Sequence, residues 1–235
     1  MDSVERARRV HRKRHALSTR LWHWLNALCL AVLFMSGLGI SNAHPQLYWG
    51  EWGFDPRTAW LRLPEFPGWA TIPGYYSLAE ARLWHFLAAW PFALGFALFL
   101  VAALLRGHWR DFVLSRNELR WAAVRDDLKA HLRLDFSAHG RRFNLLQKIL
   151  YIAVLFVGLP LMILTGLTLS PAMDSAWPWL LDLFGGRQSA RSIHFVVAWG
   201  LLGFFVLHIL AVLLDDPLRQ VRDMVTGGRR AEAPS

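Results

Sequence analysis

Hydrophobic residues in this chain gather into four long runs that polar segments separate. A helix needs about 20 apolar residues to cross the hydrocarbon core of a bilayer, and each run reaches that length. We therefore expect an all-α fold, an integral membrane four-helix bundle that forms a single domain over residues 1–235. The predicted spans are Leu21 to Ile40, Leu83 to Leu105, Ile149 to Leu169 and Ile193 to Leu214.

Arginine and lysine residues predict the orientation of the spans. Residues 1–20 carry seven of them, residues 106–148 carry ten and residues 214–235 carry four, whereas loops 42–79 and 170–188 carry three together. Because cytoplasmic loops are enriched in these residues, we expect both termini and the middle loop to be cytoplasmic. Loops 42–79 and 170–188 then face outward, to the periplasm of a bacterium.

The segments between the spans carry patterns of their own. Residues 112–134 have apolar positions at helical spacing, which indicates either a helix in the inner headgroup layer or a solvated linker helix. Loop 42–79 holds five prolines, which argue against a long helix. It is also rich in tryptophan and tyrosine, residues that anchor spans at membrane interfaces and that also form docking surfaces.

The composition agrees with a membrane protein. Hydrophobic residues make up 54% of the chain and charged residues 18%, below the fraction of roughly 25% in soluble domains. The net charge of +9 falls in blocks between the spans, without a nucleic-acid-binding motif, so we expect no nucleic-acid partner. A lone cysteine, Cys29, excludes an iron–sulfur cluster held by four thiolates and a haem attached through Cys-x-x-Cys-His.

Four histidines lie inside the predicted spans, where ionisable groups are costly and usually functional. The predicted orientation places His23 and His208 near the inner face, and His85 and His194 near the outer face. His194 and His208 are 14 residues apart, which returns to within about 40° of one helix face after a rise of about 21 Å. We expect His23 to pair with His208 and His85 with His194, each pair holding one b-type haem iron, because two axial imidazoles make a six-coordinate haem.

Arginine and glycine residues near these histidines are further candidates. Arg20 lies one turn before the first histidine, and Arg82 and Arg191 each precede a histidine by three residues. Their guanidinium groups could form ion pairs with haem propionates, or the side chains could equally extend to the lipid headgroups. Gly37 lies fourteen residues after the first histidine on the same face, where a glycine would admit a porphyrin or permit close helix packing.

The sequence resembles a family of di-haem cytochrome b membrane subunits. Its first span, TRLWHWLNALCLAVLFMSGL, is similar to the opening helix in the nickel–iron hydrogenase and formate dehydrogenase gamma members. The segments GLPLMILTGLTLSP (158–171) and ARSIHFVVAWGLLGFFVLHI (190–209) look like the thiosulfate reductase cytochrome b branch. The resemblance covers about residues 15–215, and His23, His85, His194 and His208 occupy the positions of the family's axial ligands.

The resemblance implies an electron-transfer subunit of the inner membrane rather than an enzyme by itself. Such a subunit links the quinone pool to a periplasmic redox enzyme, such as a molybdenum enzyme or a hydrogenase. An inner quinone site has three candidate residues, Asn26, Arg20 and His15. A quinone site at the outer face is the alternative. The alternatives are a stand-alone quinone-linked oxidoreductase that acts on a small substrate such as superoxide, and a haem-free transporter or scaffold.

Overall fold

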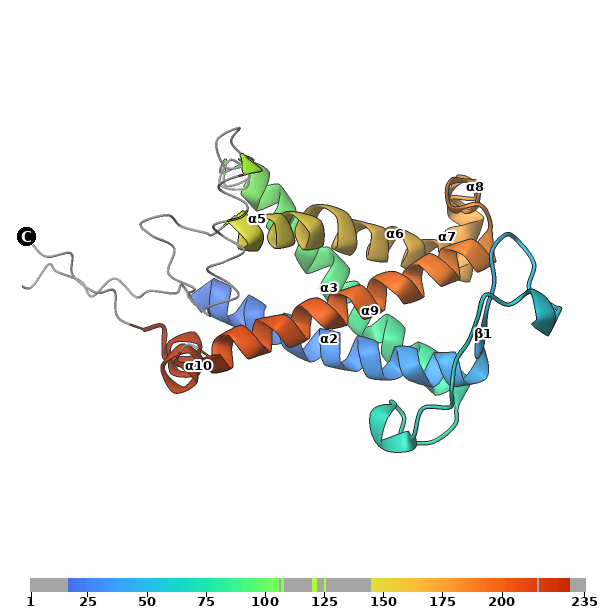
Figure 1. The fold of residues 1–235 in the computed structure, drawn as a ribbon, viewed down its shortest axis with the longest axis horizontal. Coiled ribbons are helices and arrows are strands. Elements are labelled where there is room, and N and C mark those ends of the chain that lie inside the picture. The colour runs from blue at the N-terminus through green and yellow to red at the C-terminus, as the bar shows by residue number, and fades with distance from the viewer. Residues whose placement is uncertain are drawn as a thin grey trace, which may run out of the picture. The chain divides into compact units, whose positions relative to one another are not determined.

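The computed structural model describes residues 17–105, 107, 120, 121, 125, 145–214 and 216–228. Helices dominate these residues, and four helical segments are long and apolar enough to cross a membrane (Figure 1). The all-α membrane bundle predicted from the sequence is therefore confirmed. The four segments are α2 (Leu17–Ala43), α3 (Leu78–Leu105), the run Gln147–Leu169 and α9 (Arg187–Leu214).

All four helical segments begin before the predicted apolar runs, and polar groups cap the first turns of α3 and α9. At α3 the Glu80 backbone N–H donates to Ser77 Oγ at 3.4 Å, an arrangement typical of a helix N-terminus. At α9 the Gln188 and Ser189 backbone N–H groups both donate to Gly50 O, at 3.0 and 3.1 Å. Hydropathy marks only the apolar part of a helix, so these capped turns escaped the prediction.

The third span is not a uniform α-helix. It consists of α5 (Leu145–Ile152), a π-helical turn η4 (Ala153–Gly158) and α6 (Leu159–Leu169). Pro160 lies in the first turn of α6. Because proline lacks an N–H and its ring crowds the preceding turn, the wider turn of η4 accommodates it while the helix continues.

Among the described residues, the helices and strands outside the four spans are short. Loop residues between α2 and α3 form a two-residue antiparallel strand pair, in which Gln46 faces Arg62, and two 3₁₀ turns. No longer helix occurs among residues 44–77, in agreement with the five prolines. The short elements are β1 (Gln46–Leu47), η1 (Pro56–Thr58), β2 (Leu61–Arg62), η2 (Gly68–Ala70), α7 (Pro171–Ala176), α8 (Trp179–Phe184) and α10 (Pro217–Thr226).

The chain divides into two compact units: residues 1–43, 66–95 and 205–235, and residues 44–65 and 96–204. In the first unit α2 packs antiparallel to α3. Gly39 lies against Ala81, and the Trp22 indole occupies the space in which Gly95 lacks a side chain. Glycines at these positions allow two membrane helices to approach closely.

α10 packs on the beginning of α2 in the same unit. The Arg20 guanidinium donates to Val225 O, and Trp24 Nε1 donates to Met224 O at 3.3 Å. Both acceptors lie in the last turn of α10, whose carbonyl groups have no partner within the helix. The side chains of α2 therefore cap the C-terminal end of α10.

In the second unit the third span runs antiparallel to α9 (Figure 1). Gly158 lies against Leu201, and the rings of Tyr151 and Phe204 are 6.5 Å apart. As residue numbers fall along the third span, the numbers of the contacted residues on α9 rise. This packing fixes which face of α9 meets the third span.

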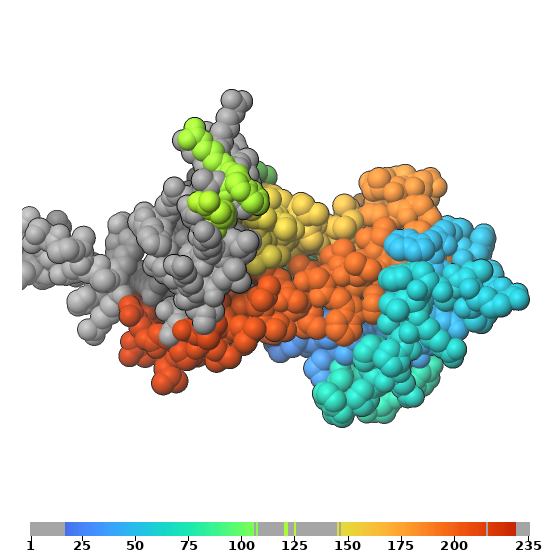
Figure 2. Space-filling view, viewed as in Figure 1, coloured from blue at the N-terminus to red at the C-terminus, as the bar shows by residue number. Residues whose placement is uncertain are grey.

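The loop residues 44–65 bind the beginning of α9, as Figure 2 shows for the segment around β1. Ser192 Oγ donates to Tyr48 O at 2.6 Å and accepts from Trp60 Nε1 at 2.9 Å. Ser189 Oγ accepts from the Gly50 backbone N–H at 2.7 Å. Polar groups of the loop and of α9 are thus hydrogen-bonded to one another around the first turns of the helix.

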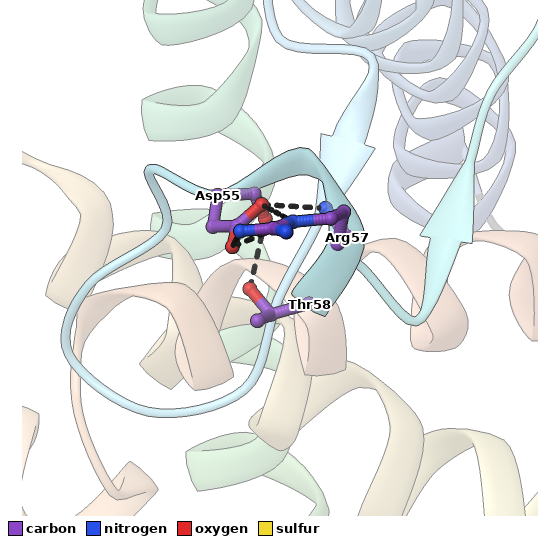
Figure 3. A network of polar contacts seen from close by, with 3 residues as sticks. All are labelled: Asp55, Arg57 and Thr58. Carbon is purple, nitrogen blue, oxygen red and sulfur yellow. Dashed lines mark hydrogen bonds and ion pairs between the residues drawn. The ribbon is translucent and has the colours of Figure 1, made fainter.

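The turn η1 has its own polar network at the tip of this loop (Figure 3). Asp55 accepts from the Arg57 backbone N–H at 2.9 Å and forms an ion pair with the Arg57 guanidinium at 2.9 Å. The hydrogen bonds from Arg57 hold the pKa of the Asp55 carboxyl below its ordinary value. Thr58 Oγ1 adds a bond to Asp55 O, so the turn is closed by its own side chains.

Three features predicted from the sequence are not tested by the structure. The amphipathic segment 112–134 lies outside the described residues except at three positions, as does His15. The orientation of the spans in the membrane stays a prediction from the basic residues.

Candidate functional site

The structure brings two of the span histidines together. His23 lies in the second turn of α2 and His208 in the last two turns of α9, and both belong to the first unit. Their ring centroids are 6.4 Å apart and their planes differ by 55°. The Trp24 indole meets the His23 ring edge-on, with centroids 5.2 Å apart.

This separation can be compared with the geometry that one metal ion imposes on two imidazoles. A metal–imidazole bond is about 2 Å long and the ring centre lies about 1 Å beyond the nitrogen, so two rings on opposite sides of one ion have centroids about 6 Å apart. The observed 6.4 Å agrees with that spacing. The pair His23 and His208 therefore fits an iron ion held between two axial imidazoles.

His85 lies toward the other end of α2. Its Nδ1 is 3.0 Å from Ser36 Oγ, and a Cβ placed on Gly37 would be 3.7 Å from its Cε1. Ser36 follows His23 by thirteen residues, a rise of about 20 Å in a helix. Along α2 the two histidine sites thus occupy two separate levels, with Gly37 at the level of His85.

His194 has closely similar surroundings in the second unit. Its Nδ1 is 2.9 Å from Thr165 Oγ1, and a Cβ on Gly166 would be 3.4 Å from its Cε1. His85 and His194 belong to different units, so their pairing stays a prediction. Both nevertheless present the same edge, Nδ1, to a hydroxyl group of a neighbouring helix.

The three candidate arginines differ in their contacts. Arg20 is 9% exposed and Arg191 is half-buried; each donates to a backbone carbonyl, of Val225 and Gln46 respectively. In both residues Nε is buried without a hydrogen-bond partner in the described part of the chain. Arg82 is exposed, with its guanidinium 5.9 Å from the centre of the Phe86 ring.

Sequence reasoning missed the two hydroxyl residues Ser36 and Thr165. The available signal was a recurring dipeptide, since Ser36 and Thr165 are each followed by a glycine late in a span. Arginine three residues before histidine likewise recurs early in the next span, at Arg82 and Arg191. Two helical hairpins therefore repeat one arrangement of hydroxyl, glycine, arginine and histidine.

Ordinary metal-binding clusters do not account for these histidines. Within the described residues, no group of three or more histidine, cysteine, aspartate or glutamate side chains could hold a metal ion. Two histidines that hold one metal ion need further ligands from a group such as a porphyrin, which supplies four nitrogens of its own. Four apolar spans, with one histidine pair spaced for a metal ion, are typical of a haem-binding membrane protein.

Comparison with known proteins also indicates a haem-binding membrane protein. A family model described as prokaryotic cytochrome b561 matches residues 14–227. The chain belongs to this family and is therefore a multi-pass membrane cytochrome that carries electrons on b-type haem.

Several curated relatives match over most of their length. A Rhodobacter capsulatus protein named as a Ni/Fe-hydrogenase B-type cytochrome subunit is 23% identical, over 97% of this chain and 84% of the relative. A protein of the same name from Cupriavidus necator is 27% identical, over 89% and 83%. A protein-methionine-sulfoxide reductase subunit, YedZ1, from Azospira oryzae is 29% identical, over 83% and 87%. No solved structure matches the chain significantly.

Proposed function

We propose that this protein is a di-haem cytochrome b of a bacterial inner membrane, which transfers electrons between the quinone pool and a periplasmic redox enzyme. The observation that carries the proposal is the pair His23 and His208, whose rings are spaced for one iron ion. The second level, at His85, supports a second haem because α2 separates the two levels by about 20 Å.

The residues divide between two haem sites. His23 and His208 hold the inner haem, and His85 and His194 hold the outer haem. These imidazoles would hold the iron without leaving an open ligand position, and a bound haem would supply one-electron transfer. The protein's part is to fix the four imidazoles on rigid helices, so that little reorganisation accompanies each transfer.

Propionate groups need cationic partners in a partly desolvated setting. Arg20 lies one turn before His23 and keeps a buried Nε–H without a partner among the described residues. Arg191 has the same property three residues before His194. We assign these two guanidiniums to the inner and outer propionates, whereas the exposed Arg82 suits either a propionate or a lipid headgroup.

The partner would dock on the outer aromatic surface, formed by Trp49, Trp52, Phe54 and Trp60. Two stacked pairs build it: Trp49 on Trp60 at 5.5 Å and Trp52 on Phe54 at 5.9 Å. Trp52 is 71% and Phe54 82% exposed, and a cluster of large exposed apolar side chains is typical of a surface that binds a partner. The relatives named as hydrogenase and methionine-sulfoxide reductase subunits support a redox enzyme as the partner. The proposed partner is a hydrogenase or a molybdenum enzyme.

Quinone exchange is assigned to the inner level. Asn26 lies one turn after His23 on α2, and one N–H of its amide donates to Trp22 O at 2.9 Å. Asn26 and Arg20 therefore place polar groups on both sides of the inner histidine. Electrons that cross between the two haems move charge through the membrane potential, worth about 2.3 kcal/mol per elementary charge per 100 mV.

Haem counting on histidine variants tests the proposal. The purified protein should contain two b-type haems per chain by pyridine haemochrome assay. His23→Ala and His208→Ala should lose one and the same haem, as judged by its midpoint potential, and His85→Ala and His194→Ala the other. His44→Ala, at the start of the outer loop, is the control that should keep both.

The outcomes separate the parts of the proposal. A wild-type protein without haem contradicts it entirely. One haem per chain contradicts the second site, and a shared haem loss in His23→Ala and His85→Ala contradicts the pairing. If Trp52→Ala leaves electron transfer to the partner unchanged, the outer aromatic surface is not the docking site.

A further inference from the structure

Two hydroxyl groups meet the outer histidines in the same way. Ser36 Oγ lies 3.0 Å from His85 Nδ1, and Thr165 Oγ1 lies 2.9 Å from His194 Nδ1. Both hydroxyl residues are fully buried within the protein, each on a helix packed antiparallel to the helix that carries the histidine. A repeated contact of this kind between different residues points to a shared role.

The direction of these hydrogen bonds follows from where each hydroxyl proton goes. Ser36 Oγ donates to Val32 O at 2.6 Å, and Thr165 Oγ1 donates to Leu161 O at 2.7 Å. A hydroxyl has one proton, and these backbone bonds are shorter than the contacts with the imidazoles. Each hydroxyl oxygen is therefore the acceptor toward the imidazole, which places the imidazole proton on Nδ1. The His85 ring also has a hydrogen bond with the Leu33 backbone.

A proton on Nδ1 has a consequence for metal binding. A neutral imidazole carries one proton, so Nε2 of His85 and of His194 keeps its lone pair and is the ligating nitrogen. If the hydroxyls donated instead, Nε2 would hold the proton and could not bind iron. Partners on the far nitrogen of a ligand histidine also fix the orientation of the ring and raise its basicity.

A glycine follows each hydroxyl residue and lies beside the same histidine ring. Gly37 follows Ser36 and Gly166 follows Thr165, and a Cβ at Gly166 would stand 3.4 Å from the His194 ring. The edge of each imidazole lies beside the glycine, where an added Cβ would make an ordinary van der Waals contact with the ring. That position brings Nδ1 within reach of the hydroxyl one residue earlier.

We propose that Ser36 and Thr165 are positioning residues for the outer haem, which set the Nδ1–H tautomer of His85 and His194 and lower the midpoint potential of that haem. The inference rests on the proposed function, because it takes these two histidines as axial ligands. A hydrogen-bond acceptor on Nδ1 makes the imidazole a stronger donor and stabilises ferric over ferrous iron. No proton is transferred, and the reaction remains the gain of one electron by ferric haem.

The test is a redox titration of Ser36→Ala and Thr165→Val with the inner haem as internal reference. Each variant should raise the midpoint potential of the outer haem alone. We expect about a threefold to tenfold change in the ferric-to-ferrous ratio at fixed ambient potential, where a tenfold change is about 59 mV for one electron. Ser36→Thr and Thr165→Ser keep an acceptor and should stay near the wild-type potential.

Thr168→Val is the matched control. Thr168 lies one turn after Thr165, is equally buried, and its hydroxyl donates to Leu164 O at 2.8 Å. A potential change in Thr165→Val that Thr168→Val does not show supports the inference, as does loss of the outer haem from Thr165→Val alone.

Three results would overturn the inference. These are a wild-type potential in both Ser36→Ala and Thr165→Val, an equal effect of Thr168→Val, or loss of the outer haem from the conservative Thr165→Ser as well. Such results with two haems in the wild-type protein leave the proposed function standing. A wild-type protein without haem contradicts both.

Discussion

Replacing Gly95 by alanine tests the packing that positions the inner histidine. The added methyl group would overlap the Trp22 indole, and the three nearest atoms are all ring atoms of that side chain. Trp22 directly precedes His23, so any movement of the tryptophan in α2 displaces the histidine. The indole is rigid, and relief requires either a new rotamer or a separation of α2 from α3.

The magnitude follows from two opposing effects. Overpacking a close contact costs about 1–3 kcal/mol. Alanine has an advantage over glycine of about 1 kcal/mol in the helices of soluble proteins, which offsets part of this cost. Because the overlap involves a ring rather than a flexible chain end, we expect a net loss of about 1–2 kcal/mol.

Thermal unfolding in detergent measures this loss, and the spectrum of the inner haem reports the displacement of His23. The control is the double variant Trp22→Leu/Gly95→Ala, in which the smaller side chain makes room for the methyl group. The double variant should be more stable than the sum of the two single effects predicts. Equal stability of Gly95→Ala and wild type, or strict additivity, would refute the reasoning.

Further predictions concern individual polar contacts. Ser192→Ala removes a fully buried hydroxyl and should lower the stability by about 1–3 kcal/mol in thermal unfolding, whereas the exposed Ser175→Ala should not. The Tyr75 hydroxyl donates to Glu80, which raises the pKa of Tyr75, so this bond contributes below about pH 10 and is lost as the pH rises through the raised pKa. Glu80→Gln should move that pKa back toward its ordinary value in an alkaline absorbance titration. Arg20→Lys replaces the guanidinium and its Nε–H donor by a single ammonium group. This variant should bind less of the inner haem, as measured by the haem-to-protein ratio.

The sequence alone determined the membrane-spanning helices, through the hydrophobic runs, and the candidate ligands, through the positions of the histidines. A segment long enough to cross a membrane must satisfy its backbone internally, so apolar length by itself predicts a helix. The 14-residue spacing of His194 and His208 placed both on one face of a single helix. Both are local properties, because they depend only on residues near one another in the sequence and not on the packing of helices.

Contacts between helices could be decided only by the tertiary structure. The approach of His208 to His23 depends on how α9 packs beside α2, and periodicity gives no rotation of one helix against its neighbour. The contacts of Ser36 with His85 and of Thr165 with His194 likewise join residues on different helices. Each hydroxyl donates to a backbone carbonyl of its own helix, a contact that is local in sequence. It becomes a hydrogen-bond partner of a histidine only because a second helix brings the imidazole to the remaining lone pair of the oxygen.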